Sequence, residues 1–480
     1  MQILIAFKKY FSSLFRLAAC LLMLSFCVPQ QIQAQEILID SVVVKGNRKT
    51  KRKVILRELD FHRGDTILTD VLSLRFNTNY LYLMNTGLFS DVVFNLKDWN
   101  TETGHGYVEV SVEETFFILP LPIFELADRN FSVWWNEMDH SLARVNFGLR
   151  MYHINLTGRG DRIRFTGQWG YTRKFEMDYE LPGINRKKTI GVGLNIFATK
   201  NKEISYRTIG NVLEFESSDD NFLYKRQRVE GRLFIRPGLF SRQVISVAYQ
   251  RNRIRSFVKD VLNPEFFGDD RTKLRWFSIS YKYSVDKRDI KPYPLTGSFL
   301  SGELRKIGLG AFSERNAFDF TGRAAKWFKL SEKFSVEAIL QGRYAFIRSK
   351  QPYYDLRALG YENDYVRGYE YYVIDGTDYV YQKTSLRYEI FNNNINFGKL
   401  SPLKAFRKMP TRVYFNLNND FGWAQDNFYG AGNPLDNTLL WGRGVGLDIN
   451  VYYTVVVQLE YSQNHLNEHG FFLHVRVGVD

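Results

Sequence analysis

Residues His465–His469 are the first candidate for chemistry in this sequence, because they match a metal-binding motif. They read HLNEH and fit the H-x-x-E-H pattern of one class of zinc metalloproteases. That chemistry requires a helix, since a helix places both imidazole rings on one face. Here the motif lies between two stretches of alternating residues and directly before Gly470, which is typical of a hairpin turn. We therefore expect no metal at this motif, and a zinc titration of the purified protein tests that expectation.

Other signatures of catalysis are missing from the sequence. It contains no G-x-S-x-G nucleophile elbow, no phosphate-binding loop of the Walker type and no Rossmann fingerprint. The only cysteines, Cys20 and Cys27, both lie near the N-terminus, so the rest of the chain has no thiolate for a metal site or a disulfide. We therefore expect no enzymatic activity and no cofactor.

A second candidate is an arginine inside an aromatic stretch. Residues 364–380 read DYVRGYEYYVIDGTDYV, with Arg367 and Gly368 among the tyrosines. A guanidinium in partly desolvated surroundings needs acceptors, and a carboxylate can accept two parallel hydrogen bonds from it. Asp364 and Glu370 are acceptors within the same segment, and Gly368 allows the backbone to turn tightly. The segment is therefore either an ordinary surface loop or a loop that buries one charge against a larger structure.

The elements that could position this arginine begin after residue 34. The first 34 residues are predicted to be a secretory signal peptide. Basic residues precede the apolar run LAACLLMLSFCV, and residues 32–34 (IQA) form a small-residue cleavage site. A lipoprotein signal ending at Cys27 is the alternative, although Phe26 is a poor residue before such a cysteine. No later run reaches the ~18 apolar residues of a spanning helix. The exported chain is therefore expected to be soluble outside the inner membrane or a barrel in an outer membrane.

Residues 36–115 are predicted to form a small α/β domain. The stretch ILIDSVVVKGN reads as a strand that ends in a turn, and HRGDTI reads as a loop between two helices over about 51–59 and 69–86. Two strands follow, and in the second one Val108, Val110 and Val112 alternate with polar residues. The predicted element order is strand, helix, helix, strand, strand.

Residues 116–480 show long alternating strands. In DRIRFTGQWGY, the residues Phe165, Gly167 and Trp169 share one face, and Arg164, Thr166 and Gln168 share the other. A soluble β-sandwich or a lipocalin-like barrel would bury the apolar face. The signal peptide, the strand length and an aromatic content of 16% favour instead a transmembrane β-barrel, which turns its apolar face to lipid. This length fits an even number of antiparallel strands, about 16.

The order of several short motifs resembles one known superfamily. Residues 36–115 resemble a single POTRA domain, through VVVKGN, RGDTI, LMNTGLFSDVVF and GYVEVSVEE. Residues 116–480 resemble the bacterial surface-antigen barrel of the BamA/TamA and two-partner-secretion transporters. Three motifs carry that resemblance: VRGY at 366–369, DKRDIKPYPLTGSFL in the middle of the barrel, and NNDFGWA near Asp420.

This resemblance implies a set of site residues. Val366, Arg367, Gly368 and Tyr369 would form the motif of a loop that folds back into the barrel lumen, with Asp420 and Gly422 as the element that accepts the arginine. The mid-barrel motif comprises Asp286, Arg288, Asp289, Pro294 and Gly297. Asp364 and Glu370 remain the local rivals of Asp420 for Arg367.

The resemblance also implies a non-enzymatic insertase in the outer membrane of a Gram-negative bacterium, with its POTRA domain in the periplasm. Its partners would be unfolded client outer-membrane proteins, outer-membrane lipid or lipopolysaccharide, and periplasmic chaperones or lipoproteins. The alternatives are a two-partner-type transporter for one secreted protein and a passive barrel.

The segment FFILPLPIF lies at or just before the first barrel strand and contains Pro120 and Pro122. Proline has no backbone N–H to donate to a neighbouring strand, so these residues predict a weakly hydrogen-bonded seam. The alternative is that the segment is a plain linker. Lys and Arg are numerous, with a formal net charge of +14, but they are spread along the strands, so we expect no nucleic-acid partner.

Overall fold

The computed structural model describes residues 35–126, 131–136, 138–218, 220–312, 315–361, 364–396, 398, 408–451 and 455–477. The predicted signal peptide therefore lies outside the described residues. None of the helices in the described ranges is long and apolar enough to span a membrane.

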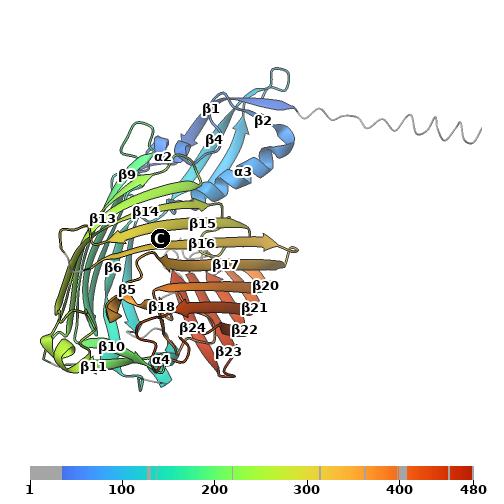
Figure 1. The fold of residues 1–480 in the computed structure, drawn as a ribbon. Coiled ribbons are helices and arrows are strands. Elements are labelled where there is room, and N and C mark those ends of the chain that lie inside the picture. Colours follow the sequence, from blue (N-terminus) through green and yellow to red (C-terminus); the bar gives the residue numbers. More distant parts are fainter. Residues whose placement is uncertain are drawn as a thin grey trace, which may run out of the picture. The chain divides into compact units, whose positions relative to one another are not determined.

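The N-terminal part is an α/β unit with four strands and two helices (Figure 1). Its sheet has the order β2-β1-β4-β3. The strand residues Ile37, Ile39 and Val108 are fully buried, and so are the helix residues Ile55 and Leu83. The elements are β1 (Glu36–Lys45), α2 (Arg52–Arg57), β2 (Thr66–Leu68), α3 (Thr69–Met84), β3 (Phe89–Lys97) and β4 (His105–Glu114).

One element of this unit differs from the sequence prediction. The end of the segment HRGDTI, which was predicted to be a loop, forms the short strand β2, and Ile67 pairs with Ile37 of β1. Ile67 is buried, whereas the flanking Thr66 and Leu68 are exposed. A strand of three residues offers too few alternating positions to be recognised from sequence, and its pairing with β1 supplies the missing stabilisation.

Among the described residues from Ile118 onward, 16 strands form one antiparallel sheet, which agrees with the predicted number of about 16. Neighbours in the sheet are neighbours in the chain except at two places, where the pairs β9–β12 and β17–β20 enclose the separate hairpins β10–β11 and β18–β19. The strands are β5 (Ile118–Leu126), β6 (Val145–His153), β7 (Arg162–Gly170), β8 (Thr172–Leu181), β9 (Ile190–Asn201), β10 (Glu203–Ile209), β11 (Val212–Ser217), β12 (Tyr224–Ile235), β13 (Ser241–Ile254), β14 (Lys273–Asp286), β15 (Gly297–Ile307), β16 (Ala317–Lys329), β17 (Phe334–Ala345), β18 (Arg357–Leu359), β19 (Ile374–Asp375), β20 (Asp378–Asn396), β21 (Lys408–Gln425), β22 (Leu440–Val451), β23 (Val455–Asn464) and β24 (His469–Val477).

The side chains of this sheet are distributed inside-out relative to a soluble protein. Trp169 in β7 is 54% exposed, whereas the neighbouring Gln168 is 6% exposed. In β21, Leu417 is 48% exposed between the buried Asn416 and Asn418. Apolar residues on the outside and polar residues on the inside are the pattern of a transmembrane barrel, and they exclude the soluble sandwich and the lipocalin-like barrel.

A long segment between β17 and β20 lies inside this barrel, because it contacts inward-facing residues of β20, β21 and β22. We call residues 346–361 and 364–377 the lumen loop; it contains the short helix Tyr353–Asp355 and the hairpin β18–β19. Its apolar side chains form one cluster with inward-facing residues of the wall; the members include Leu359, Val366, Tyr369, Ile374, Tyr379, Tyr381, Ala424 and Leu440. The lumen loop is therefore a packed part of the core.

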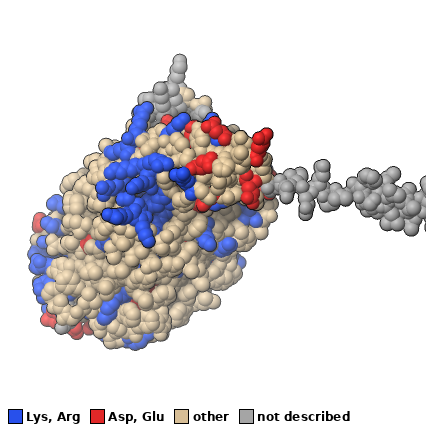
Figure 2. All heavy atoms as spheres, turned by 90° about the horizontal axis from the view of Figure 1, so that it is seen from above, with Lys and Arg blue, Asp and Glu red and all other residues tan. Residues whose placement is uncertain are grey.

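The surface charge is less evenly spread than the sequence suggested. Figure 2 shows Lys and Arg side chains gathered on one face of the molecule. In the turn between β8 and β9, a Cβ atom on Gly183 would lie 3.0 Å from Lys188 Cδ and 3.2 Å from Arg57 Nη1, so basic residues of separate segments lie close together. Burial and then the positive charge of Arg159 lower the pKa of Lys188. Such a patch arises when turns from different strands meet at one end of a sheet, and alternation along the strands gives no sign of it.

Candidate functional site

Arg367 of the lumen loop contacts Asp420 of β21. Its Nε atom lies 3.1 Å from Asp420 Oδ2, and its backbone N–H donates to the same oxygen over 3.2 Å. Its Nη1 donates to Ser385 Oγ of β20 at 3.0 Å, and Glu460 Oε1 of β23 lies 3.9 Å from Nε. The contact differs from the two parallel bonds considered above, because one carboxylate oxygen accepts from both the side chain and the backbone. The arginine thus ties the loop to three strands.

The two local rivals of Asp420 have other partners. Asp364 accepts hydrogen bonds from the hydroxyl groups of Tyr379 and Tyr381 and from Gln341 Nε2. Glu370 points to His474 of β24, whose Nε2 lies 3.9 Å from Glu370 Oε1. Both acids instead hold other parts of the lumen loop against the wall.

Glycines of the wall make room for the loop backbone. A Cβ atom on Gly422 would lie 2.3 Å from Val366 Cγ2, and one on Gly442 would lie 1.7 Å from the carbonyl oxygen of Arg367. Gly368 has φ +86°, and a Cβ there would meet the backbone of Gln463 at 2.8 Å. The sequence motifs contained Gly368 and Gly422 but missed Gly442, since its need appears only when β22 is placed beside the loop.

Tyr369 joins the lumen loop to the turn between β23 and β24. Its hydroxyl oxygen accepts from the N–H of Trp441 at 3.1 Å and contacts the His465 ring. Asn464 Nδ2 donates to the Gly368 carbonyl at 3.1 Å. The HLNEH residues thus form the predicted hairpin turn, with β23 ending at Asn464 and β24 beginning at His469. One of their imidazoles serves loop packing.

The loop also contacts the inward face of β24. The Tyr365 ring stacks on the His474 ring with centroids 5.1 Å apart, and Tyr371 packs on Phe472 at 5.3 Å. The helix α4 (Phe131–Asn136), which follows β5 in the chain, packs against β24 as well. The last strand of the sheet is therefore held largely by the loop, by α4 and by β23.

The mid-barrel motif lies mainly in the turn between β14 and β15. Arg288 donates to both carboxylate oxygens of Asp286, through Nη2 at 2.7 Å and Nε at 2.8 Å. Asp289 accepts from the backbone N–H groups that follow Pro294, which closes the turn. Gly297 has φ +109°, and a Cβ there would lie 2.1 Å from the Lys287 carbonyl oxygen.

This turn reaches a second buried ion pair that sequence reasoning missed. The carbonyl oxygen of Pro294 accepts from Arg387 Nη1 at 3.0 Å, and Arg387 Nη2 lies 2.7 Å from Glu337 Oε2. The Arg387 guanidinium also covers the Tyr293 ring, whose hydroxyl donates to Asp448 at 2.8 Å. The sequence pattern of β20 could have predicted that Arg387 is buried, because the odd-numbered residues from Tyr379 to Arg387 all face inward.

A buried asparagine joins the lumen loop to two connections outside the strands. Asn211, in the turn between β10 and β11, donates through Nδ2 to Asp436 Oδ1 at 2.8 Å. Its side-chain oxygen accepts from Leu435 N–H, and its carbonyl oxygen accepts from Val373 N–H. Burial, followed by the charge of Asp375, raises the pKa of Asp436 to about 7.

Two protein-family models match the chain. The Omp85 superfamily domain matches residues 155–451, and the POTRA model, described as a surface antigen variable number repeat, matches residues 37–115. This chain belongs to the Omp85 superfamily. It is therefore an outer-membrane β-barrel protein with one POTRA domain, which faces the periplasm.

Solved structures of other Omp85 proteins share the fold. BamA from Haemophilus ducreyi lacking POTRA domains 1–3 is 13% identical, with a TM-score of 0.51 over 92% of this chain and 84% of that chain. CdiB from Escherichia coli is 12% identical, with a TM-score of 0.56 over 92% of this chain and 76% of that one. A search of curated protein sequences found no match.

Proposed function

We propose that this Omp85 protein is a non-enzymatic insertase that folds client β-barrel proteins into the outer membrane by pairing client strands with an open edge of its own sheet. The observation that carries this proposal is the seam between β5 and β24. The sheet order runs linearly from β24 to β5, and within the described residues these two strands are not hydrogen-bonded neighbours. Unpaired edges recruit further strands.

The prolines of β5 weaken its free edge without weakening its pairing with β6. The N–H of Ile154 donates to the carbonyl of Phe117, so residues of odd number in β5 face β6 with their backbone groups. Residues of even number therefore turn theirs to the seam. Pro120 and Pro122 have even numbers, and they remove two donors from the edge of β5 that would close the barrel.

The edge of β24 keeps its full set of donors and acceptors. The N–H of Asn464 donates to the carbonyl of Glu468, which places residues of even number in β24 against β23. Phe471, Leu473, Val475 and Val477 consequently present both N–H and C=O to the seam. Because β5 lacks donors where β24 has them, we propose that β24 is the template on which a client strand pairs.

A covalent lock between β5 and β24 tests this proposal. The chain after residue 34 has no cysteine, so paired cysteines can be introduced one pair at a time in the two strands. A disulfide between β5 and β24 should abolish client insertion, and reduction should restore it. The matched control is Leu459→Cys with Leu473→Cys, which joins directly opposed residues of the already paired β23 and β24. Full activity of the locked β5–β24 form refutes lateral opening.

Depletion followed by outer-membrane proteomics separates the proposed function from its rivals. An insertase should lose many barrel proteins at once. A two-partner-type transporter, which has the same fold, should lose one secreted protein and leave the barrels unchanged. An unchanged proteome would indicate a passive barrel. We propose unfolded outer-membrane proteins as clients, outer-membrane lipid or lipopolysaccharide around the barrel, and chaperones or lipoproteins at the POTRA domain.

A further inference from the structure

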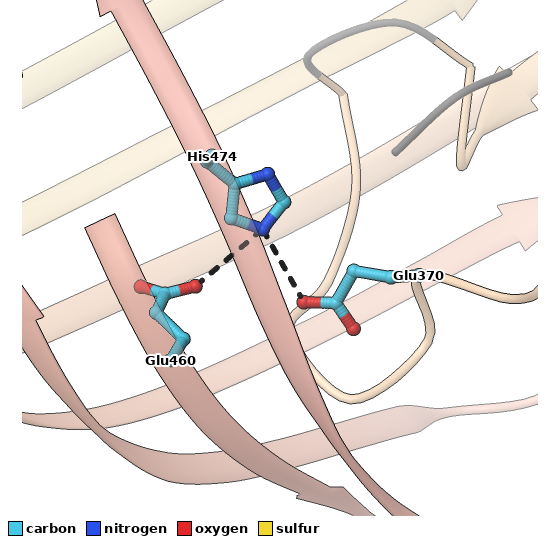
Figure 3. Close-up of side chains that lie close together, drawn as sticks. All are labelled: Glu370, Glu460 and His474. Atoms are coloured by element: carbon cyan, nitrogen blue, oxygen red, sulfur yellow. Dashed lines mark ion pairs between the residues drawn. The ribbon is translucent and has the colours of Figure 1, made fainter. Parts of the chain in front are cut away.

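Three metal-binding side chains from separate segments meet inside the barrel. Figure 3 shows Glu370 of the lumen loop and Glu460 of β23 pointing toward His474 of β24. His474 Nε2 lies 3.7 Å from Glu460 Oε2 and 3.9 Å from Glu370 Oε1. One ligand atom from each residue lies within 4.8 Å of the other two, and in the described part of the chain this is the one such group of three.

A second observation is a set of buried acceptor atoms without a hydrogen-bond donor at the same place. The cluster lines a cavity of about 360 Å³, which Asn416 and Asn418 of β21 also line. The side-chain oxygens of both asparagines are buried and accept no hydrogen bond from the described residues, and the same holds for Glu460 Oε2. Buried acceptors without a donor are costly, and a cation in the cavity would remove that cost.

The donor set favours a transition metal over calcium or magnesium. Imidazole nitrogen and carboxylate oxygen are both zinc ligands, and three protein ligands leave a fourth position open for water. Ligand atoms around zinc lie ~3.4 Å apart when each bond is ~2.1 Å, so the observed 3.7 and 3.9 Å need only a small closure. Five basic residues also line the cavity: Arg323, Arg367, Lys383, Arg387 and Arg476. Their charge opposes every cation equally, so binding depends on the bond from the imidazole nitrogen, a ligand that suits zinc and not calcium or magnesium.

We propose that Glu370, Glu460 and His474 form a binding site for a divalent transition metal of the zinc class. The metal would join the lumen loop, β23 and β24. Because β24 is the free edge of the sheet, such a metal would fix the terminal strand to the loop. The site is independent of whether the protein inserts clients or secretes one substrate.

Metal binding by the full-length protein in detergent micelles tests the proposal. After chelator treatment, zinc is titrated by calorimetry, and cobalt(II) is titrated by absorption to report the ligand field. We expect one saturable site per chain, weakened at least ~10-fold in His474→Gln, because the variant loses the imidazole ligand. The matched control is His469→Gln, which removes an exposed histidine of the HLNEH turn and should bind like the wild type.

The outcomes are distinguishable from a folding defect. Heat-modifiable mobility on gels reports whether each variant is folded, and Glu460→Gln gives a second, independent loss of a ligand. No saturable binding by the folded wild-type protein at ~100 μM free zinc overturns the proposal. Wild-type affinity in folded His474→Gln also overturns it, and loss of binding in His469→Gln would move the site to the turn.

Discussion

Replacing Arg367 with alanine should destabilise the folded barrel strongly. Arg367 and Asp420 are 6% and 0% exposed, and the substitution leaves the Asp420 carboxylate without its charged partner. Removing one member of a buried ion pair costs ~3–5 kcal/mol. Asp420 keeps the backbone N–H of residue 367, so we expect the lower end, about 3 kcal/mol, or roughly a 100-fold shift in the unfolding equilibrium.

The assay is equilibrium urea unfolding in detergent micelles, followed by tryptophan fluorescence and by heat-modifiable mobility. Arg443→Ala is the matched control. Arg443 is exposed on β22, where it donates to Gln463 Oε1 and lies over the Trp441 ring. Arg367→Lys should recover part of the loss, because one ammonium cannot replace both the Nε contact with Asp420 and the Nη1 contact with Ser385.

A double variant shows whether the loss comes from the pair itself. Combining Arg367→Ala with Asp420→Asn removes the unpaired charge, so the double variant should be more stable than the sum of the single effects predicts, by about 1 kcal/mol or more. An unchanged urea midpoint in Arg367→Ala, or strict additivity in the double variant, would refute the reasoning that this pair holds the lumen loop.

Three further predictions concern the seam and the connections outside the strands. Pro120→Val with Pro122→Val restores two donors to the free edge of β5, so we expect slower client insertion with unchanged barrel yield; faster insertion would contradict the seam argument. The raised pKa of Asp436, about 7 against an ordinary 3.8, means that the folded loop holds a proton which the unfolded loop releases. The stability of the folded loop should therefore fall as the pH rises from about 4 to about 7. Hydrogen exchange of residues 426–439 measures this stability, and Asp436→Asn should make it less dependent on pH. Asn211→Ala removes bonds to Asp436 and Leu435, and it should increase exchange in that loop and near Val373, whereas exposed Asn221→Ala should not.

The sequence by itself determined the fold class and the loop motif. Alternation with a period of two is a local property, so Trp169 and Gln168 were assigned to opposite faces without any knowledge of neighbouring strands. Their exposures of 54% and 6% agree with a barrel that faces lipid. The need of a guanidinium for an acceptor is likewise local, and the resemblance to the superfamily named Asp420 as the partner to consider, beside Asp364 and Glu370. The strand β2 was missed because its pairing with β1, and not its composition, stabilises it.

Only the tertiary structure decided which groups meet inside the lumen. Arg387, Glu337 and Asp448 come from three strands, and nothing in their sequence spacing brings them together around Tyr293. The cluster of Glu370, Glu460 and His474 depends in the same way on the register of β23 against β24 and on the path of the loop. Which of the seam-facing donors are missing from β5 also required the ladder, because a strand's sequence does not reveal which neighbour its N–H groups face. The physical reason is common to all three: alternation assigns a side chain to a face, but register and curvature assign it a partner.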